Sequence, residues 1–267
     1  MEKRKTIIDS VRQEQSNVLL LDSGDIFDMF PMAMRDKYVA DVYRMLSYQA
    51  MAIGDQDFSE GLDFFRKFTA GQEDKVLNTN LSIEGKTPGK TYLVETFQGV
   101  RIGITATVDS NAFRYIDAKI KKALTFSDPI SSLRPVVKLL EDKCDYRILL
   151  SHCGLEIDEE LAKAYPQFDL IIGGHSQDLL ETPVKIGRTL IVQAGNDGYH
   201  FGILNLAFKN KKLISYDNYL RLLDNTVRND PEIANIISEY RQERQDYFLN
   251  RRKIRSEVQK TVNSGSR

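Results

Sequence analysis

The sequence predicts an α/β sandwich with a metal site at the carboxyl ends of its strands. Several apolar runs that read as buried strands end on a carboxylate or an imidazole, and segments with helical spacing separate them. With 267 residues, of which 42% are hydrophobic, the chain is long enough to bury a large core. Its net charge of −1 gives no overall attraction to nucleic acid or to acidic membranes.

Four strand ends carry residue types that divalent metals prefer. In chain order the candidate ligands are Asp25, Asp55, His152 and His175. Carboxyl ends of strands in an α/β fold meet along one edge, where these side chains can converge. Each motif also has an ordinary structural reading, because Gly-Asp after a strand is usually a turn and a lone histidine is usually hydrogen-bonded. Two of the three histidines in the chain follow apolar runs directly, which favours the metal site.

The first half of the chain alternates predicted helices with short strands. Helical spacing is expected at 2–15, 36–46 and 62–68, and strands at 18–21, 50–53 and 76–77. Two further strands, 91–96 and 100–105, form a predicted hairpin around Gln98-Gly99, since glycine supports the turn.

In the second half, a helix at 129–141 is capped by Asp128 and precedes the strand of His152. The segment 109–125 has no clear period and is expected to be an irregular lid over the site. Strands are expected at 190–193, 201–208 and 213–222, and we expect them to complete a second sheet.

The remaining histidine and the two cysteines carry weaker signals. His200 opens a strand after a glycine turn, so a structural role is expected, with substrate contact as the alternative. Cys144 and Cys153 flank one strand and are too far apart for a disulfide. Cys153 adjoins His152 and is a minor candidate ligand. The chain has no run of 18 apolar residues, and its first residues lead into a helix rather than a signal peptide.

Seven short segments, taken in order, carry a resemblance to a known family: 20–25, 52–58, 78–80, 100–104, 149–154, 169–176 and 191–195. Together they resemble the catalytic domain of the 5'-nucleotidase branch of the calcineurin-like metallophosphoesterases. The resemblance covers roughly residues 5–225. It implies an αββα sandwich of two mixed sheets flanked by helices at residues 1–228, an amphipathic helix at 229–262 and a disordered tail at 263–267.

The resemblance implies one retained metal position, held by Asp25, Asp55, His152 and His175. Asp55 stands where the family has asparagine, and two carboxylates with two imidazoles suit Zn²⁺, Mn²⁺ or Fe²⁺. The alternative is neutral drift of Asp55 in an inactive site. A second metal is not expected, because the family's Asp-x-His strand has no counterpart in this sequence and Gln177 replaces the last histidine of its loop. Gln177 and His200 are left as residues that contact substrate or support a ligand from behind.

The family's acid histidine and its aspartate partner are also replaced, by Gln56 and Ser59. Glutamine does not titrate, so the general-acid contribution of roughly 10²–10⁴-fold is unavailable from this position. The resemblance therefore implies a degenerate domain with little or no phosphoesterase activity that acts as a subunit or interaction module. The alternative is an active nucleotide hydrolase that an upstream segment or a partner completes. A hydrolase of the same branch acting on sulfur-linked substrates is a third reading.

The segment after residue 230 reads as one long amphipathic helix. Pro231 lies in its first turn, and Arg251, Arg252, Lys253 and Arg255 make its end basic. A solvated face is the default reading, and a docking surface for another chain or domain is the alternative.

Partner expectations follow from the same resemblance. We expect another protein chain or a further domain, with a segment filling the place of the family's first strand or docking on the long helix. A cytochrome-type partner is a weaker expectation, since related domains occur joined to multi-haem segments and this chain has no Cys-x-x-Cys-His. A nucleic acid polymer is not expected. The resemblance implies a periplasmic or other extracytoplasmic location.

Overall fold

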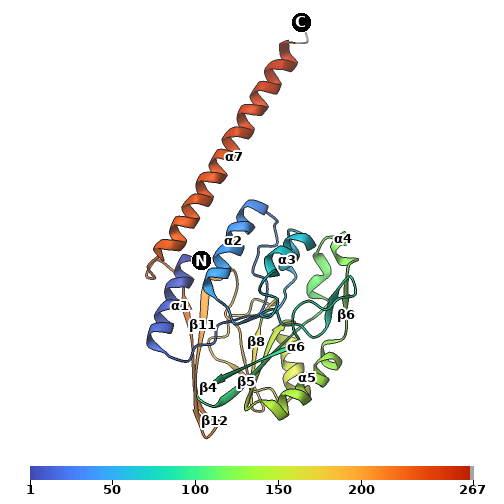
Figure 1. Ribbon diagram of the computed structural model, residues 1–267, viewed down its shortest axis with the longest axis vertical. Coiled ribbons are helices and arrows are strands. Elements are labelled where there is room, and N and C mark those ends of the chain that lie inside the picture. The colour runs from blue at the N-terminus through green and yellow to red at the C-terminus, as the bar shows by residue number, and fades with distance from the viewer. Residues whose placement is uncertain (265–267) are drawn as a thin grey trace.

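The computed structural model describes the backbone of residues 1–264 and the side chains of residues 1–255. Two β-layers pack face to face, and helices cover both outer faces, so the predicted α/β sandwich is confirmed (Figure 1). The α-helices are α1 (Glu2–Glu14), α2 (Ala33–Leu46), α3 (Leu62–Thr69), α4 (Ala118–Lys121), α5 (Pro129–Lys143), α6 (Leu155–Ala164) and α7 (Pro231–Ser264). Two short 3-10 helices are η1 (Gln56–Phe58) and η2 (Ala112–Tyr115).

The larger sheet has six strands in the order β4-β5-β7-β8-β10-β9. Its strands are β4 (Tyr92–Phe97), β5 (Val100–Val108), β7 (Tyr146–His152), β8 (Leu170–Gly173), β9 (Val184–Ile186) and β10 (Thr189–Val192). The four central strands are parallel, and β4 and β9 are antiparallel edges. The predicted hairpin is confirmed: β4 turns into β5 at Gln98 and Gly99, both of which have positive φ.

The second layer is built from strand pairs. β1 (Leu21–Asp22) pairs in parallel with β2 (Ala50–Met51), and β11 (His200–Lys209) forms a long antiparallel ribbon with β12 (Lys212–Leu222). A third pair joins β3 (Leu81–Ile83) to β6 (Leu124–Phe126). The expectation that strand 190–193 belongs to this second sheet is wrong. That strand is β10 of the larger sheet, because the chain returns from β8 through β9 and pairs alongside β8.

Successive side chains of β7 point alternately into the two apolar cores on either side of the larger sheet. Ile148 and Leu150 point into the core between the two β-layers, together with Ala52 and Leu190. Leu149 points the other way, into the core beneath α5 and α6. This period-two burial is what places successive strand residues on opposite faces. It fixes the strand register, and therefore which residue stands at each carboxyl end.

Helices α1, α2 and α3 cover the other β-layer, and α7 packs against α2 and α1 through its first turns before it runs away from the domain (Figure 1). Tyr38 of α2 meets Tyr240 of α7, with ring centroids 5.5 Å apart. No helix in the described part of the chain is both long and apolar enough to cross a bilayer. Of the expected tail at 263–267, residues 263–264 fall in the last turn of α7 and 265–267 lie outside the described residues.

The segment 109–125 is folded, contrary to the expected irregular lid. It forms η2, α4 and the start of β6. Phe113 is completely buried, and its ring lies 4.8 Å from that of Phe126 and 6.0 Å from that of Phe58. Aromatic burial therefore anchors the segment to the core that α2 and α3 cover.

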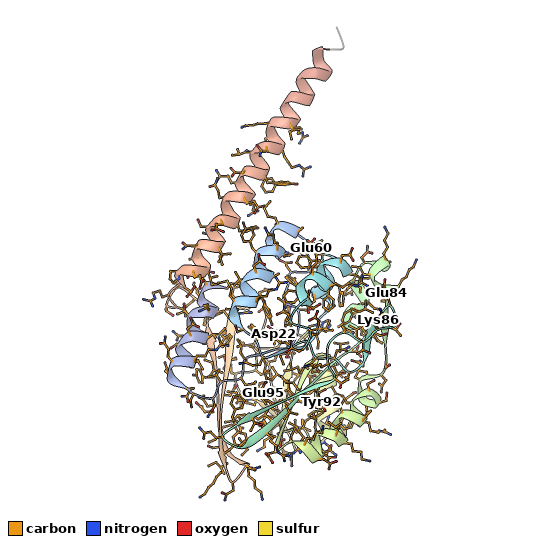
Figure 2. All side chains as sticks on the ribbon, in the orientation of Figure 1. Asp22, Glu60, Glu84, Lys86, Tyr92 and Glu95 are labelled. Atoms are coloured by element: carbon orange, nitrogen blue, oxygen red, sulfur yellow. The ribbon has the colours of Figure 1, made fainter. Side chains whose placement is uncertain are left out.

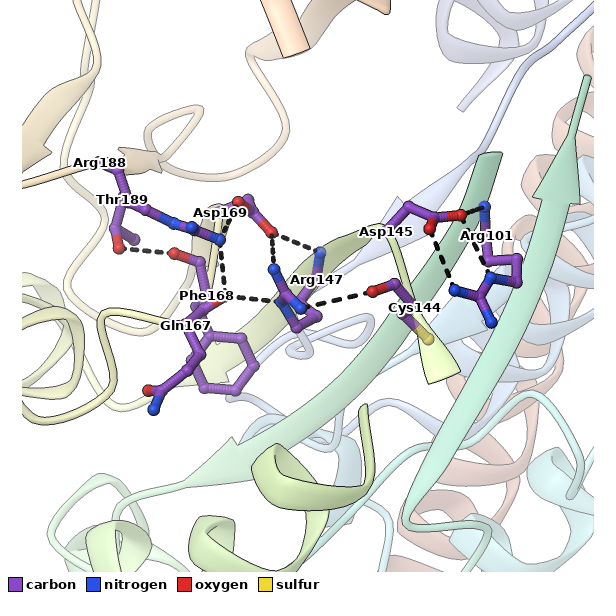
Figure 3. A network of polar contacts seen from close by, with 9 residues as sticks. All are labelled: Arg101, Cys144, Asp145, Arg147, Gln167, Phe168, Asp169, Arg188 and Thr189. Atoms are coloured by element: carbon purple, nitrogen blue, oxygen red, sulfur yellow. Dashed lines mark hydrogen bonds and ion pairs between the residues drawn. The ribbon is translucent and has the colours of Figure 1, made fainter. Parts of the chain in front are cut away.

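A ladder of ion pairs ties the amino ends of the central strands together (Figure 3). Asp145 accepts hydrogen bonds from the backbone and side chain of Arg101, the second residue of β5. One residue before β8, Asp169 binds Arg147 of β7 and Arg188 before β10. These contacts lie at the opposite ends of the strands from the candidate ligands, so they fix strand register without taking part in the site.

A buried charge lies where α1 meets β1. Arg4 of α1 donates a hydrogen bond to the hydroxyl of Tyr48 at 3.4 Å. Asp22 lies within the body of the domain (Figure 2), and burial raises its pKa, which the positive charge of Arg4 opposes. Helix α1 therefore contributes a positive charge close to the end of β1.

Candidate metal centre

Asp25, Asp55, His152 and His175 converge at the carboxyl ends of the strands, as the sequence predicts. One ligand atom from each residue lies within 4.8 Å of all the others. His152 Nε2 is 3.2 Å from Asp55 Oδ1 and 3.4 Å from Asp25 Oδ1, and His175 Nδ1 is 3.3 Å from Asp55 Oδ1. Residues separated by more than a hundred positions in the sequence thus share one small volume.

These spacings fit a single metal ion. Four ligand atoms placed tetrahedrally about 2.0–2.2 Å from Zn²⁺ lie roughly 3.3–3.6 Å from one another. Of the three short separations in the group, 3.3 and 3.4 Å fall within that range and 3.2 Å lies just below it. The side chain of His152 is fully buried, and that of His175 is 32% exposed, so the group opens to solvent on the side of His175.

Two glycines allow the loops after β1 and β2 to approach this closely. A Cβ on Gly54 would lie 2.2 Å from Asp25 Oδ1, and a Cβ on Gly24 would lie 2.9 Å from His152 Nδ1. Real Cβ atoms do not come this near to other atoms, so larger residues would push Asp25 away from the imidazole. The Gly-Asp pairs in the sequence therefore bring two carboxylates against one histidine.

Asp57 links the same two loops. Its buried carboxylate accepts the N–H groups of Gly54 and Ile26, each at 2.8 Å. Burial, with the charge of Asp25 adding to it, raises the pKa of Asp57 to about 7. The backbone N–H of Gln56 donates to Asp25 Oδ1 at 2.9 Å. One backbone donor thus holds the Asp25 carboxylate in place, and two others hold Asp57 beside it.

The backbone also orients His152. Its Nδ1 lies 2.7 Å from the carbonyl oxygen of Ser23 and, as the donor of that pair, must carry the proton. Nε2 then faces Asp25 and Asp55. This is the arrangement of a metal-ligating histidine whose other nitrogen is held by a carbonyl.

Charge within the group shifts two pKa values in opposite directions. Burial lowers the pKa of His152, but the carboxylates of Asp25 and Asp55 outweigh it and hold the pKa well above its ordinary value. Burial raises the pKa of Asp55, but hydrogen bonds from His152 and His175 bring it down to about 2. Without a metal ion, His152 therefore keeps a proton at the place where the positive charge of a metal ion would otherwise lie.

The other sequence candidates differ in their exposure and surroundings. The side chain of Gln177 is exposed, and His200 is half-buried as the first residue of β11. Ser59 lies next to η1 with its hydroxyl buried and unpaired. Cys153 is buried, and burial raises the pKa of its thiol well above the ordinary value. Among the described residues, the metal-ligand group contains none of these four.

The sequence analysis did not identify two residues that hydrogen-bond within and to the loop of His175. Gln193 is 5% exposed directly after β10, and Ser176 follows His175. The Ser176 hydroxyl accepts the N–H of Leu155 at 3.1 Å and lies 3.2 Å from the Gln193 amide. The available signal was a polar residue ending an apolar strand, which is the same signal that marks the ligands.

Nucleotide phosphoesterases and 5'-nucleotidases are among the known proteins that are similar to this chain. No family model matches the chain. It is 25% identical to the trifunctional nucleotide phosphoesterase protein YfkN of Bacillus subtilis, over 91% of this chain and 20% of that protein. It is 27% identical to the 5'-nucleotidase of Rattus norvegicus, over 88% of this chain and 46% of the relative. The crystal structure of a 5'-nucleotidase precursor from Thermus thermophilus superimposes with a TM-score of 0.79 and 28% identity, covering 91% of this chain and 53% of that one.

Over most of its own length the chain is similar to 5'-nucleotidases. The structural match also confirms the metallophosphoesterase fold inferred from the motifs. The chain spans about half the length of the rat relative and 20% of the Bacillus protein, so what those whole proteins do applies here only as a proposal.

Proposed function

We propose that this chain is a degenerate metallophosphoesterase domain that holds one divalent metal ion and has little or no phosphoesterase activity. The observation that supports it is the compact group of Asp25, Asp55, His152 and His175, beside which glutamine occupies the position of the family's acid. We further propose that the domain acts as a subunit or interaction module.

The donor set suits one Zn²⁺, Mn²⁺ or Fe²⁺. A divalent ion at this position supplies positive charge that stabilises the charge developing on a phosphate ester. Asp55 and Asp25 bring two negative charges to the ion, and the Ser23 carbonyl keeps Nε2 of His152 turned toward it. The exposed side of His175 is where a phosphate oxygen could reach the ion.

The chain's own residues offer no group to protonate a leaving oxygen at the family position. Gln56 follows Asp55 directly, and its amide neither gains nor loses a proton at working pH. The third histidine, His200, lies outside the ligand group. A phosphate ester at this site would therefore lose its leaving oxygen without acid assistance from Gln56, which accounts for the low turnover that we propose.

Phosphate release from 5'-AMP tests this proposal. The purified chain is assayed with Mn²⁺ or Zn²⁺, with a chelator control, beside the double variant Gln56→His, Ser59→Asp. We expect negligible release from the natural chain and at least tenfold more from the double variant, since it regains an acid and its partner. Robust, chelator-sensitive release from the natural chain would overturn the degenerate reading.

An active hydrolase completed by another segment is the second candidate, and the sheet topology supports it. Among the described strands, β1 pairs with β2 alone and β11 with β12 alone, although both pairs border the same core between the β-layers. β1 and β11 therefore each have one edge without a strand partner, and unpaired backbone groups at such an edge attract a further strand.

Light scattering and amide hydrogen exchange test whether the domain needs another segment to complete its sheet or is stable alone. If another segment is required, the purified chain should associate, and the amides of Leu19 and Leu21 should exchange much faster than those of β7. A monomer with protected amides in both edge strands would contradict the subunit role.

A further inference from the structure

The loop that carries His175 is held in a backbone conformation that its residues disfavour. His175 has φ 69° and Gln177 has φ 61°, both in the left-handed region. For residues other than glycine this conformation costs about 1 kcal/mol or more each. The strain persists only where surrounding contacts determine the loop, so something must hold it.

Gln193 is placed to do so. Its amide oxygen accepts the backbone N–H of Gln177 at 2.9 Å and that of Asp178 at 3.2 Å, and its amide nitrogen donates to Ser176 Oγ at 3.2 Å. The hydrogen-bond network itself assigns this orientation of the amide. One side chain thus makes three hydrogen bonds to three consecutive residues after His175.

The anchor beneath Gln193 is rigid. Val192, the preceding residue, pairs with Ile172 of β8, and β8 is the strand that leads into the same loop. Gln193 is 5% exposed, so water does not compete for its amide. The N–H of Leu155, the first residue of α6, donates to Ser176 Oγ from the other side at 3.1 Å. The loop is therefore clamped between the end of β10 and the start of α6.

We propose that Gln193 is a positioning residue for His175. By satisfying the turn's backbone donors, it stabilises the strained loop and keeps Nδ1 of His175 within 3.3 Å of Asp55 Oδ1. The inference rests on the proposed metal centre, because His175 must face Asp55 in order to bind the metal ion there. Groups that orient a ligand from behind typically contribute about 10–100-fold to metal affinity.

Three variants test the role. Gln193→Leu removes the three hydrogen bonds and keeps the apolar bulk. Gln193→Glu keeps an acceptor for the two backbone N–H groups, and the Ser176 hydroxyl can donate to it instead. Gln72→Leu is the matched control, because Gln72 is also buried and donates to a backbone carbonyl, that of Phe68 at 2.7 Å, outside the site.

Two measurements are made on each folded variant: Co²⁺ and Zn²⁺ affinity by calorimetry, and the imidazole ¹⁵N resonances of His175 and His200 in metal-free protein. We expect Gln193→Leu to lose at least tenfold in affinity and to shift the His175 resonances only. Gln193→Glu should stay within about threefold of the natural chain. Gln72→Leu should lower the melting temperature without changing affinity or the His175 resonances.

The two readouts separate this inference from the proposed function. If the natural chain binds no metal, the proposed function fails, and the His175 resonances in metal-free protein still decide the role of Gln193. A folded Gln193→Leu variant with unchanged His175 resonances and affinity overturns the inference. If Gln193→Leu does not fold, Ser176→Ala removes the hydrogen bonds that the Ser176 hydroxyl makes with Gln193 and Leu155, and it must shift the His175 resonances in the same direction by a smaller amount.

Discussion

The Ser23 carbonyl oxygen lies 2.7 Å from Nδ1 of His152 and fixes which imidazole nitrogen faces the carboxylates. Ser23 follows β1 and His152 ends β7, so the contact joins the two β-layers at the candidate site. The proton on Nδ1 belongs to this hydrogen bond. The proton on Nε2 exists only because Asp25 and Asp55 stabilise it, and it is the one that a metal would replace.

Metal binding should therefore release a proton and strengthen as the pH rises. The pKa of His152 is raised in the folded, metal-free protein, so its ion pairs stabilise the fold fully below the ordinary histidine pKa of 6.5 and are lost as pH rises through the folded value. We expect the increase in melting temperature caused by Zn²⁺ to grow between pH 6 and 8. Calorimetry in buffers of different ionisation enthalpy measures the released proton; an affinity independent of pH would contradict the assignment.

Asp55→Asn separates a functional carboxylate from neutral drift. The substitution restores the family's residue but removes one negative charge from a group that, by the proposal, binds a single cation. We expect at least a tenfold loss of Zn²⁺ affinity, since carboxylate is the better ligand for a divalent ion. Asp109→Asn, a change of the same kind just after β5, is the control for charge alone. Equal affinities in the natural chain and Asp55→Asn would favour drift.

Gly54→Ala should disrupt the site more than the fold. The added Cβ would lie 2.2 Å from Asp25 Oδ1 and 2.3 Å from the Asp25 backbone nitrogen, so the β1 loop must move. We expect loss of metal binding together with a lower melting temperature. Gly202→Ala is the matched control, because its Cβ meets side-chain atoms at 3.7 and 3.8 Å, an ordinary contact. Metal binding by Gly54→Ala equal to that of Gly202→Ala would contradict the close approach.

The candidate ligands could be predicted from sequence because each is an aspartate or histidine that follows an apolar run within four residues. That pattern reports the strand end, and strand ends of an α/β fold share one edge. The place of β10 could not be predicted in the same way, since pairing with β8 depends on the path of the connecting loop. Gln193 was missed because its partners are backbone groups of another loop, which no residue type marks.

Asp158 in α6 is another residue whose environment could not be predicted from the sequence. It lies four residues into α6, where a polar residue in sequence reads as an exposed position, yet it is completely buried. Its carboxylate oxygens have no hydrogen-bond partner, and a Cβ on Gly173 would lie 2.5 Å from one of them. Only the three-dimensional approach of α6 to the end of β8 reveals this environment.

Burial raises the pKa of Asp158 from 3.8 to about 7. Between these values the folded protein holds a proton that the unfolded chain has released, so the free energy of unfolding should fall as pH rises from about 4 to 7. The loss should amount to a few kcal/mol, on the order of 1.4 kcal/mol per pH unit at its steepest. Asp158→Asn cannot ionise, so it should reduce this dependence to the part that Asp57 contributes, and it should be more stable than the natural chain at pH 7.5.

Urea unfolding of metal-free protein at pH 5, 6, 7 and 8 measures the effect. Asp145→Asn is the control of opposite sign, because hydrogen bonds from Arg101 hold the pKa of Asp145 below its ordinary value. Its contribution is present above the ordinary aspartate pKa and disappears only as pH falls through the lower folded value, so it should leave the slope between pH 5 and 8 unchanged. If Asp158→Asn keeps the slope of the natural chain, the buried carboxyl is not the group that titrates.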